Sequence, residues 1–278
     1  MTHEEHCRAY EAEFPEKWQA LTESFNKEGE DAFWQIRHAS YIFRTGGVRW
    51  GIDLTLRTDA LMDFTDGRAG RDLGKLAFVL TSHFHSDHFN ARFCRQLDMP
   101  DTVWVVPDFA NEEQRNVITG AHEHVIFVHA GDKLNIAGMQ INVLPGHHFD
   151  DGGTTGIESY TYSVDTGKKL IYFPGDVRDY RTKVTADVNK PDLLFAHVWL
   201  GRSRALLTEN SEFLDPYCRY IAGIGAKRVM LTHLYNFTRP DIEMWGDSHA
   251  ESVINGLKQL GCASEAQIPY LGEINLIP

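Results

Sequence analysis

The sequence predicts an α/β protein with two mixed β-sheets covered by helices, and three observations support this class. The chain has 278 residues, of which 42% are hydrophobic and 24% charged, so it can form a full-sized hydrophobic core. In its first half, short apolar runs of strand type follow one another, as in antiparallel or mixed sheets. In its second half, such runs alternate with helical patterns, which is typical of parallel strands joined by helices.

Residues 1–35 are predicted to form a helical extension packed on the main domain, residues 36–278. One face of the predicted helix carries Phe14, Trp18, Leu21 and Phe25, spaced by four, three and four residues. Pro15 suits the first turn of this helix, and Gly29 suits its end. We therefore expect this helix to pack its apolar face against the domain.

The remaining elements follow from apolar runs punctuated by glycine and proline. The predicted strands are Ser40–Arg44, Val48–Leu56, Leu76–Thr81, Thr102–Val106, Val125–His129, Met139–Leu144, Tyr160–Val164, Lys169–Phe173, Leu193–Leu200 and Arg228–Leu231. The predicted helices are Ala91–Leu97, Asn111–Ile118, Asp179–Val188, Glu209–Ile224 and Asp241–Leu260.

Composition excludes several classes of protein. The net charge of −12 argues against a broad basic surface for nucleic acid or for anionic membranes. No apolar run approaches the length that spans a bilayer, and the N-terminus lacks the pattern of a secretory signal. The four cysteines have no CxxC spacing and are interpreted as reduced thiols, so we expect a cytoplasmic protein. The 14 histidines are the one feature that composition does not explain.

A dense cluster of metal-ligand residues directly follows the predicted strand Leu76–Thr81. His83, His85, Asp87 and His88 form an H-x-H-x-D-H pattern. Residues two apart on an extended segment point the same way, so the first two histidines can bind one ion. A turn into the next helix would direct the other two residues to a second ion. Imidazole and carboxylate ligands suit zinc, iron or manganese.

Three other predicted strands also end in residues of ligand type. Pro-Gly-His147-His148 follows the strand Met139–Leu144, and Pro-Gly-Asp176 and Thr-His233 follow two later strands. A rigid strand end can aim such a side chain with little freedom. Together with the H-x-H-x-D-H pattern, these residues predict a site with two metal ions.

With these motifs in this order, the sequence from about residue 36 to 278 resembles the metallo-β-lactamase-fold superfamily of metallohydrolases. The resemblance implies a four-layer αββα sandwich of two mixed β-sheets flanked by helices. It implies one metal bound by His83, His85 and His147, a second bound by Asp87, His88 and His233, and Asp176 bridging the two. Asp53 matches an early strand aspartate that orients ligands. The segment Ile36–Ser40 is similar to the branch that includes ascorbate-phosphate lactonase.

Some assignments stay open at this stage. His148 follows His147 directly and could replace it as the ligand or contact the substrate, and the acidic segment 149–156 could form a loop or a lid. His197, Arg202 and Tyr235 are further candidates for substrate binding, since they lie near or after the ends of predicted strands. An arginine there could bind a phosphate or a carboxylate.

The sequence thus predicts a metal-dependent hydrolase that uses two divalent ions, zinc in the first place and manganese or iron otherwise. A hydroxide bridging the ions would attack a small anionic ester, phosphoester or lactone, and Asp87 would accept or relay a proton. The alternatives are a ribonuclease or phosphodiesterase, a mononuclear iron sulfur dioxygenase and a non-enzymatic metal protein. The acidic balance argues against a nucleic acid partner, no membrane is expected, and oligomeric state is not predicted.

Overall fold

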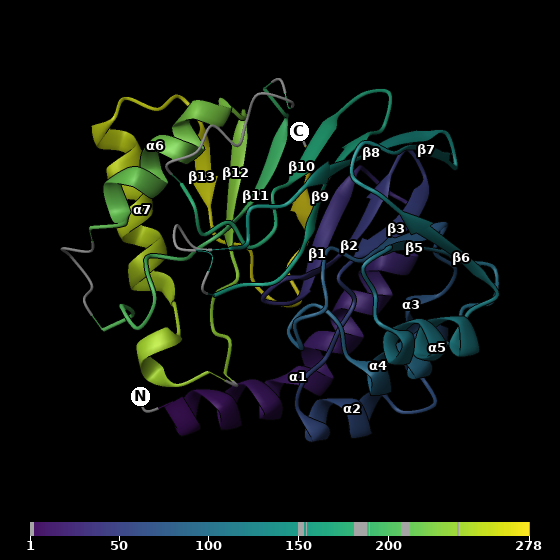
Figure 1. Ribbon diagram of the computed structural model, residues 1–278. Coiled ribbons are helices and arrows are strands. Elements are labelled where there is room, and N and C mark those ends of the chain that lie inside the picture. The colour runs from purple at the N-terminus through teal and green to yellow at the C-terminus, as the bar shows by residue number, and fades with distance from the viewer. Residues whose placement is uncertain are drawn as a thin grey trace. The chain divides into compact units, whose positions relative to one another are not determined.

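The chain divides into two compact units, described from a computed structural model (Figure 1). Unit 1 comprises residues 1–137 and 270–278, and unit 2 comprises residues 138–269. The structure describes residues 3–149, 153, 155–180, 188, 190–206, 212–237 and 239–277. Among these residues, no helix combines the length and the apolar character needed to cross a membrane.

The helices are α1 (His3–Asn26), α2 (Asp59–Thr65), α3 (Ala69–Leu73), α4 (Ala91–Gln96), α5 (Glu112–Ala121), α6 (Leu214–Ile224) and α7 (Asp247–Gln259), with a 3₁₀ turn η1 (Asp241–Glu243). The strands are β1 (Ala32–Arg37), β2 (Ser40–Thr45), β3 (Val48–Ile52), β4 (Phe78–Leu80), β5 (Val103–Pro107), β6 (His124–Val128), β7 (Lys133–Ile136), β8 (Met139–Pro145), β9 (Tyr160–Asp165), β10 (Leu170–Phe173), β11 (Leu193–His197), β12 (Arg228–Thr232), β13 (Glu265–Gln267) and β14 (Asn275–Leu276). They form two seven-stranded mixed sheets, so the predicted α/β class with two mixed sheets flanked by helices is confirmed.

Unit 1 contains the sheet with strand order β14-β1-β2-β3-β4-β5-β6. Strands β1 to β3 are antiparallel, and β3 to β6 are parallel. Directly paired aromatic side chains stack across four neighbouring strands: Phe33, Phe43, Trp50 and Phe78. All four are fully buried, and such cross-strand aromatic pairs fix the register of a sheet.

Helix α1 is built into the core of unit 1. Its four predicted apolar residues are fully buried together with Trp34 of β1, and Trp18 Nε1 donates to Asp72 Oδ2 of α3 at 2.9 Å. The helix begins at His3, so the prediction that Pro15 lies in its first turn is wrong, and Pro15 lies inside the helix. An interior proline costs one backbone hydrogen bond, and burial of the apolar face offsets that cost. The division of the chain at residue 35 stays a prediction.

The second sheet has the strand order β13-β12-β11-β10-β9-β8-β7. In unit 2, β9 is antiparallel to both β8 and β10, whereas β10 to β13 are parallel. Since two antiparallel steps separate β8 from β10, these two strands run in the same direction. The apolar faces of α6 and α7, with Ile221 and Val253, join Leu194 and Val229 of the sheet in one core.

The predicted strands all occur, as β2 to β6 and β8 to β12. The prediction missed β1 and the short elements α2, α3, β7, β13 and β14, whose few residues give little periodic signal. The helix predicted over Asp241–Leu260 is interrupted before α7, where Gly246 precedes the first helical residue. Of the helix predicted over Asp179–Val188, residues 181–187 lie outside the described residues, as do residues 150–152 and 154 of the acidic loop.

We predict that Leu21→Ala lowers the free energy of unfolding by about 3 kcal/mol, because it deletes a fully buried side chain and leaves a cavity. Urea unfolding measures this value. The matched control is Gln19→Ala on the exposed face of α1, which we expect to change stability by less than about 0.5 kcal/mol. Equal stability of the two variants would mean that α1 is only loosely attached.

Candidate metal centre

In unit 1, the donor residues of the H-x-H-x-D-H segment follow β4 directly. His83, Asp87 and His88 are almost fully buried, and His85 is half-buried. The backbone turns back at His85, whose carbonyl oxygen accepts hydrogen bonds from the amides of residues 88 and 89. This turn brings the ring centroids of His83 and His88 to within 3.9 Å of each other. The ring centroids of His83 and His85 are 5.0 Å apart. Four residues of ligand type therefore lie together at one end of β4.

The Asp53 carboxylate organises this cluster from the end of the neighbouring strand β3. It accepts hydrogen bonds from Ser82 N and Ser82 Oγ, both at 2.7 Å, and lies 2.8 Å from His88 Nδ1. A histidine that donates from Nδ1 to a carboxylate carries its lone pair on Nε2, which is how metal-bound histidines are commonly held. The orienting role of Asp53 toward a metal ligand stays a prediction.

Asp87 has a basic neighbourhood that the sequence did not predict. Arg57 Nη1 lies 3.9 Å from Asp87 Oδ2, and His38 Nε2 lies 4.0 Å from the same oxygen. Arg37 Nε donates to His38 Nδ1 at 3.1 Å, so the His38 proton is on Nε2, the side of Asp87. His38 belongs to the segment noted for its family resemblance, but a single histidine gives no spacing signal that would predict a role beside Asp87.

Unit 2 presents a second donor set, at the ends of strands that run in the same direction. His148 follows β8, Asp176 follows β10, His197 ends β11 and His233 follows β12. Asp176 lies at their centre: His197 Nδ1 is 2.6 Å from Oδ1, and the Nε2 atoms of His233 and His148 are 3.6 and 3.7 Å from Oδ2. All four side chains are buried. Three imidazoles around one carboxylate form a donor set suited to a divalent transition metal.

His148, rather than His147, points to Asp176. His148 is fully buried, whereas His147 is half-buried. The carbonyl oxygen of His147 accepts a hydrogen bond from Arg178 N at 2.9 Å. Burial lowers the pKa of His147, and the charge of Asp179 opposes that shift. Gly146 allows the chain to turn here, since a Cβ at this position would lie 2.6 Å from the Ser159 carbonyl oxygen. A glycine is thus required where the chain passes Ser159, directly before the two histidines.

Three of these four donors, all except His148, line a small pocket of unit 2. The pocket is lined by Asp176, Val177, Arg178, His197, Val198, Trp199, His233, Arg239 and Trp245. His197 was a predicted substrate contact and lies in this pocket, whereas Arg178, Arg239 and Trp245 were not predicted. Burial lowers the pKa of Arg178, Asp176 opposes the shift, and Arg239 adds to it as a like charge.

Two other predicted substrate contacts lie outside the lining of this pocket. Arg202 is exposed to solvent. Tyr235 is half-buried, and its hydroxyl accepts a hydrogen bond from Asp247 N at the start of α7. Their roles as substrate contacts stay predictions.

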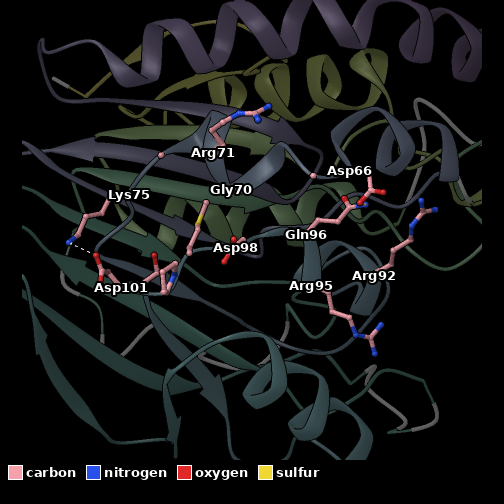
Figure 2. A pocket seen from close by; sticks show the side chains of 14 residues that line it. Asp66, Gly70, Arg71, Lys75, Arg92, Arg95, Gln96, Asp98 and Asp101 are labelled. Atoms are coloured by element: carbon pink, nitrogen blue, oxygen red, sulfur yellow. Dashed lines mark hydrogen bonds and ion pairs between the residues drawn. The ribbon is translucent and has the colours of Figure 1, made fainter.

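Unit 1 also has an open pocket that contains none of the donor residues (Figure 2). Its lining includes the charged residues Asp66, Arg71, Lys75, Arg92, Arg95, Asp98 and Asp101. Lys75 pairs with Asp101 at 3.0 Å, and Arg92 pairs with Asp59. Both cations and carboxylates line this pocket and the ion pairs are exposed, so the buried histidine clusters are the better candidate for the functional site.

A family model described as "Beta-lactamase superfamily domain" matches residues 55–234. The chain belongs to the beta-lactamase superfamily. This confirms the predicted superfamily and supports a metal-dependent hydrolase, while the narrower resemblance to the lactonase branch stays a prediction. The matched residues contain every predicted metal ligand. No curated protein sequence matches the chain.

Several solved structures share the fold at low sequence identity. The metallo-beta-lactamase fold protein YhfI from Bacillus subtilis is 15% identical, with a TM-score of 0.64 over 89% of this chain and 99% of that one. A metallo hydrolase from Ignicoccus hospitalis is 14% identical, with a TM-score of 0.57 over 88% and 97%. The diiron beta-hydroxylase CmlA from Streptomyces venezuelae is 14% identical, with a TM-score of 0.61 over 90% of this chain and 55% of that one. At this identity, the likeness concerns the fold alone.

We predict that Asp53→Asn lowers zinc affinity by about 10- to 100-fold, since an amide can still accept from Ser82 N but cannot accept from His88 Nδ1. Competition with a chromophoric chelator at neutral pH measures the affinity. The exposed Asp98→Asn serves as the control, with wild-type affinity expected. Unchanged affinity in the Asp53 variant would remove Asp53 from the support of the site.

A histidine outside these clusters gives a prediction about pH. His122 stacks on Trp104 at a centroid distance of 3.9 Å, and burial lowers its pKa from 6.5 to about 4. The unfolded chain therefore binds this proton more readily, and the folded state loses about 3 kcal/mol as the pH falls from 6.5 to 4.

His122→Phe keeps the stacked ring and removes this titration. We expect the free energy of unfolding of the variant, relative to wild type, to rise by about 3 kcal/mol between pH 7 and pH 4 in urea titrations. The exposed His124→Phe should show no such change. Parallel pH profiles for wild type and His122→Phe would show that His122 does not titrate in this way.

Proposed function

We propose that the protein is a hydrolase that uses two divalent metal ions on a small anionic ester, phosphoester or lactone. One observation carries this proposal: in a beta-lactamase superfamily domain, buried imidazole and carboxylate groups cluster at the strand ends of both units. Zinc is the first candidate for the metal and manganese or iron the alternatives, because imidazole-rich sites with carboxylates accept all three.

We assign one ion to His83, His85 and His148, and the other to Asp87, His88 and His233, with Asp176 shared by the two. The assignment follows the sequence motifs except at one position, where His148 replaces His147. The distance of 3.7 Å between His148 Nε2 and Asp176 Oδ2 supports this change. His197, which is 2.6 Å from the other oxygen of Asp176, would hold that carboxylate in place.

When bound, the ions would supply Lewis-acid chemistry, lowering the pKa of a water molecule and polarising the carbonyl or phosphoryl oxygen of the substrate. Residues of the chain would transfer the proton and orient the metal ligands. Asp87 would accept or relay a proton, and Arg57 and the Nε2–H of His38 would stabilise its carboxylate form before that transfer. Asp53 would keep His88 in the tautomer that has its lone pair on Nε2.

We predict that the purified protein contains stoichiometric zinc, manganese or iron by elemental analysis and hydrolyses members of a panel of nitrophenyl esters and phosphodiesters. His83→Ala and His148→Ala should each lose bound metal and at least about 100-fold in kcat/KM, because each removes an imidazole ligand. The exposed His124→Ala serves as the control and should retain both properties, with folding of all variants checked by circular dichroism.

Two results would contradict this assignment in different ways. Absence of a stoichiometric metal, or full activity of His83→Ala, would remove the hydrolase proposal. Loss of metal in His147→Ala but not in His148→Ala would instead return the ligand role to His147.

A further inference from the structure

Two arginines share the pocket of unit 2 with the candidate metal ligands. Arg178 lies two residues after Asp176, and Arg239 lies six residues after His233. Both line the pocket together with Asp176, His197 and His233. The segments that follow β10 and β12 thus each contain one candidate metal ligand and one arginine.

Arg178 is held in place without a carboxylate partner among the described residues. Its guanidinium lies 5.6 Å from the centre of the Trp199 ring, and Nη1 is 3.4 Å from Thr155 Oγ1. Its backbone amide is bonded to the His147 carbonyl oxygen. Stacking on an indole fixes the plane of an arginine and leaves most of its five N–H donors available to a ligand.

The electrostatics of the pocket favour an anion beside these arginines. Arg178 is half-buried and has Arg239 as a neighbouring like charge. Glu243, whose charge also acts on Arg178, accepts hydrogen bonds from Ser203 N and Oγ. The whole chain carries a net charge of −12, so an anionic substrate needs a local positive field in order to be retained.

We propose that Arg178 and Arg239, with Trp199 beside them, form an oxyanion subsite that binds a phosphate or carboxylate group of the substrate. This inference rests on the proposed hydrolase function and specifies its substrate class: a small molecule with an anionic group separate from the bond that is cleaved. A guanidinium offers two parallel N–H donors that match both phosphate and carboxylate. The indole rings of Trp199 and Trp245 would contact the part of the substrate that lies between its anionic group and the bond that is cleaved.

The test compares nitrophenyl esters of one chain length whose far end is neutral, a carboxylate or a phosphate. Arg178→Leu and Arg239→Leu should each lower kcat/KM for an anionic ester relative to the neutral ester by about 10- to 100-fold, mainly through KM. Arg178→Lys should recover part of the ratio, because it keeps the charge and loses the paired donors. The control Arg219→Leu removes an exposed arginine of α6 and should leave the ratio at its wild-type value.

A binding measurement keeps the subsite testable apart from hydrolysis. Isothermal titration of metal-loaded wild type with inorganic phosphate and with acetate should show tighter binding than in either leucine variant, and the tighter ligand indicates which anion the subsite prefers. If no ester is hydrolysed but the variants lose anion binding, the proposed hydrolysis fails and the subsite stands. Two results would contradict the subsite. One is a wild-type ratio of kcat/KM for anionic and neutral esters, together with wild-type anion binding, in leucine variants that keep the wild-type melting temperature. The other is an equal loss of kcat/KM for neutral and anionic esters.

Discussion

In each sheet, the strands that carry donor residues run in the same direction, and the candidate site depends on this constraint. Parallel strands β3 and β4 end at the same edge of their sheet, so Asp53 reaches the segment that contains His83 and His88. In the other sheet, β8, β10, β11 and β12 all end at one edge, where Asp176 has three histidines around it. Side chains that are far apart in sequence converge because hydrogen-bonded ladders fix both the direction and the spacing of their strands.

The donor clusters lower the stability of the folded state, because buried imidazole and carboxylate groups lose their hydration. Hydrogen bonds offset this cost within each unit. Asp53 uses its two oxygens for Ser82 and His88, and Asp176 Oδ1 is bonded to His197. A bound divalent cation would stabilise such clusters further, since it neutralises the carboxylates and binds the imidazole lone pairs.

The strands and the metal motif could be predicted because their signals are local. Apolar runs of four or more residues predicted the strands, whereas α3, a helix of five residues, and β14, a strand of two, are too short to produce a recognisable period. Local reasoning also placed Pro15 at a helix start, since nothing in the sequence reveals how much apolar surface α1 buries. His38, Arg178 and Arg239 could not be recognised as site residues, because each is an isolated residue whose neighbours come from distant segments.

The sequence by itself determined the superfamily, the fold class and the residue types of the metal motif. These depend on patterns of a few consecutive residues and on the order of the motifs, which the chain carries regardless of its conformation. Only the tertiary structure decided that His148 faces Asp176, that Arg57 and His38 flank Asp87, and that two arginines share a pocket with His233. The physical reason is that side-chain direction is set by close packing, as where Gly146 meets Ser159, and by strand pairing between segments that are distant along the chain.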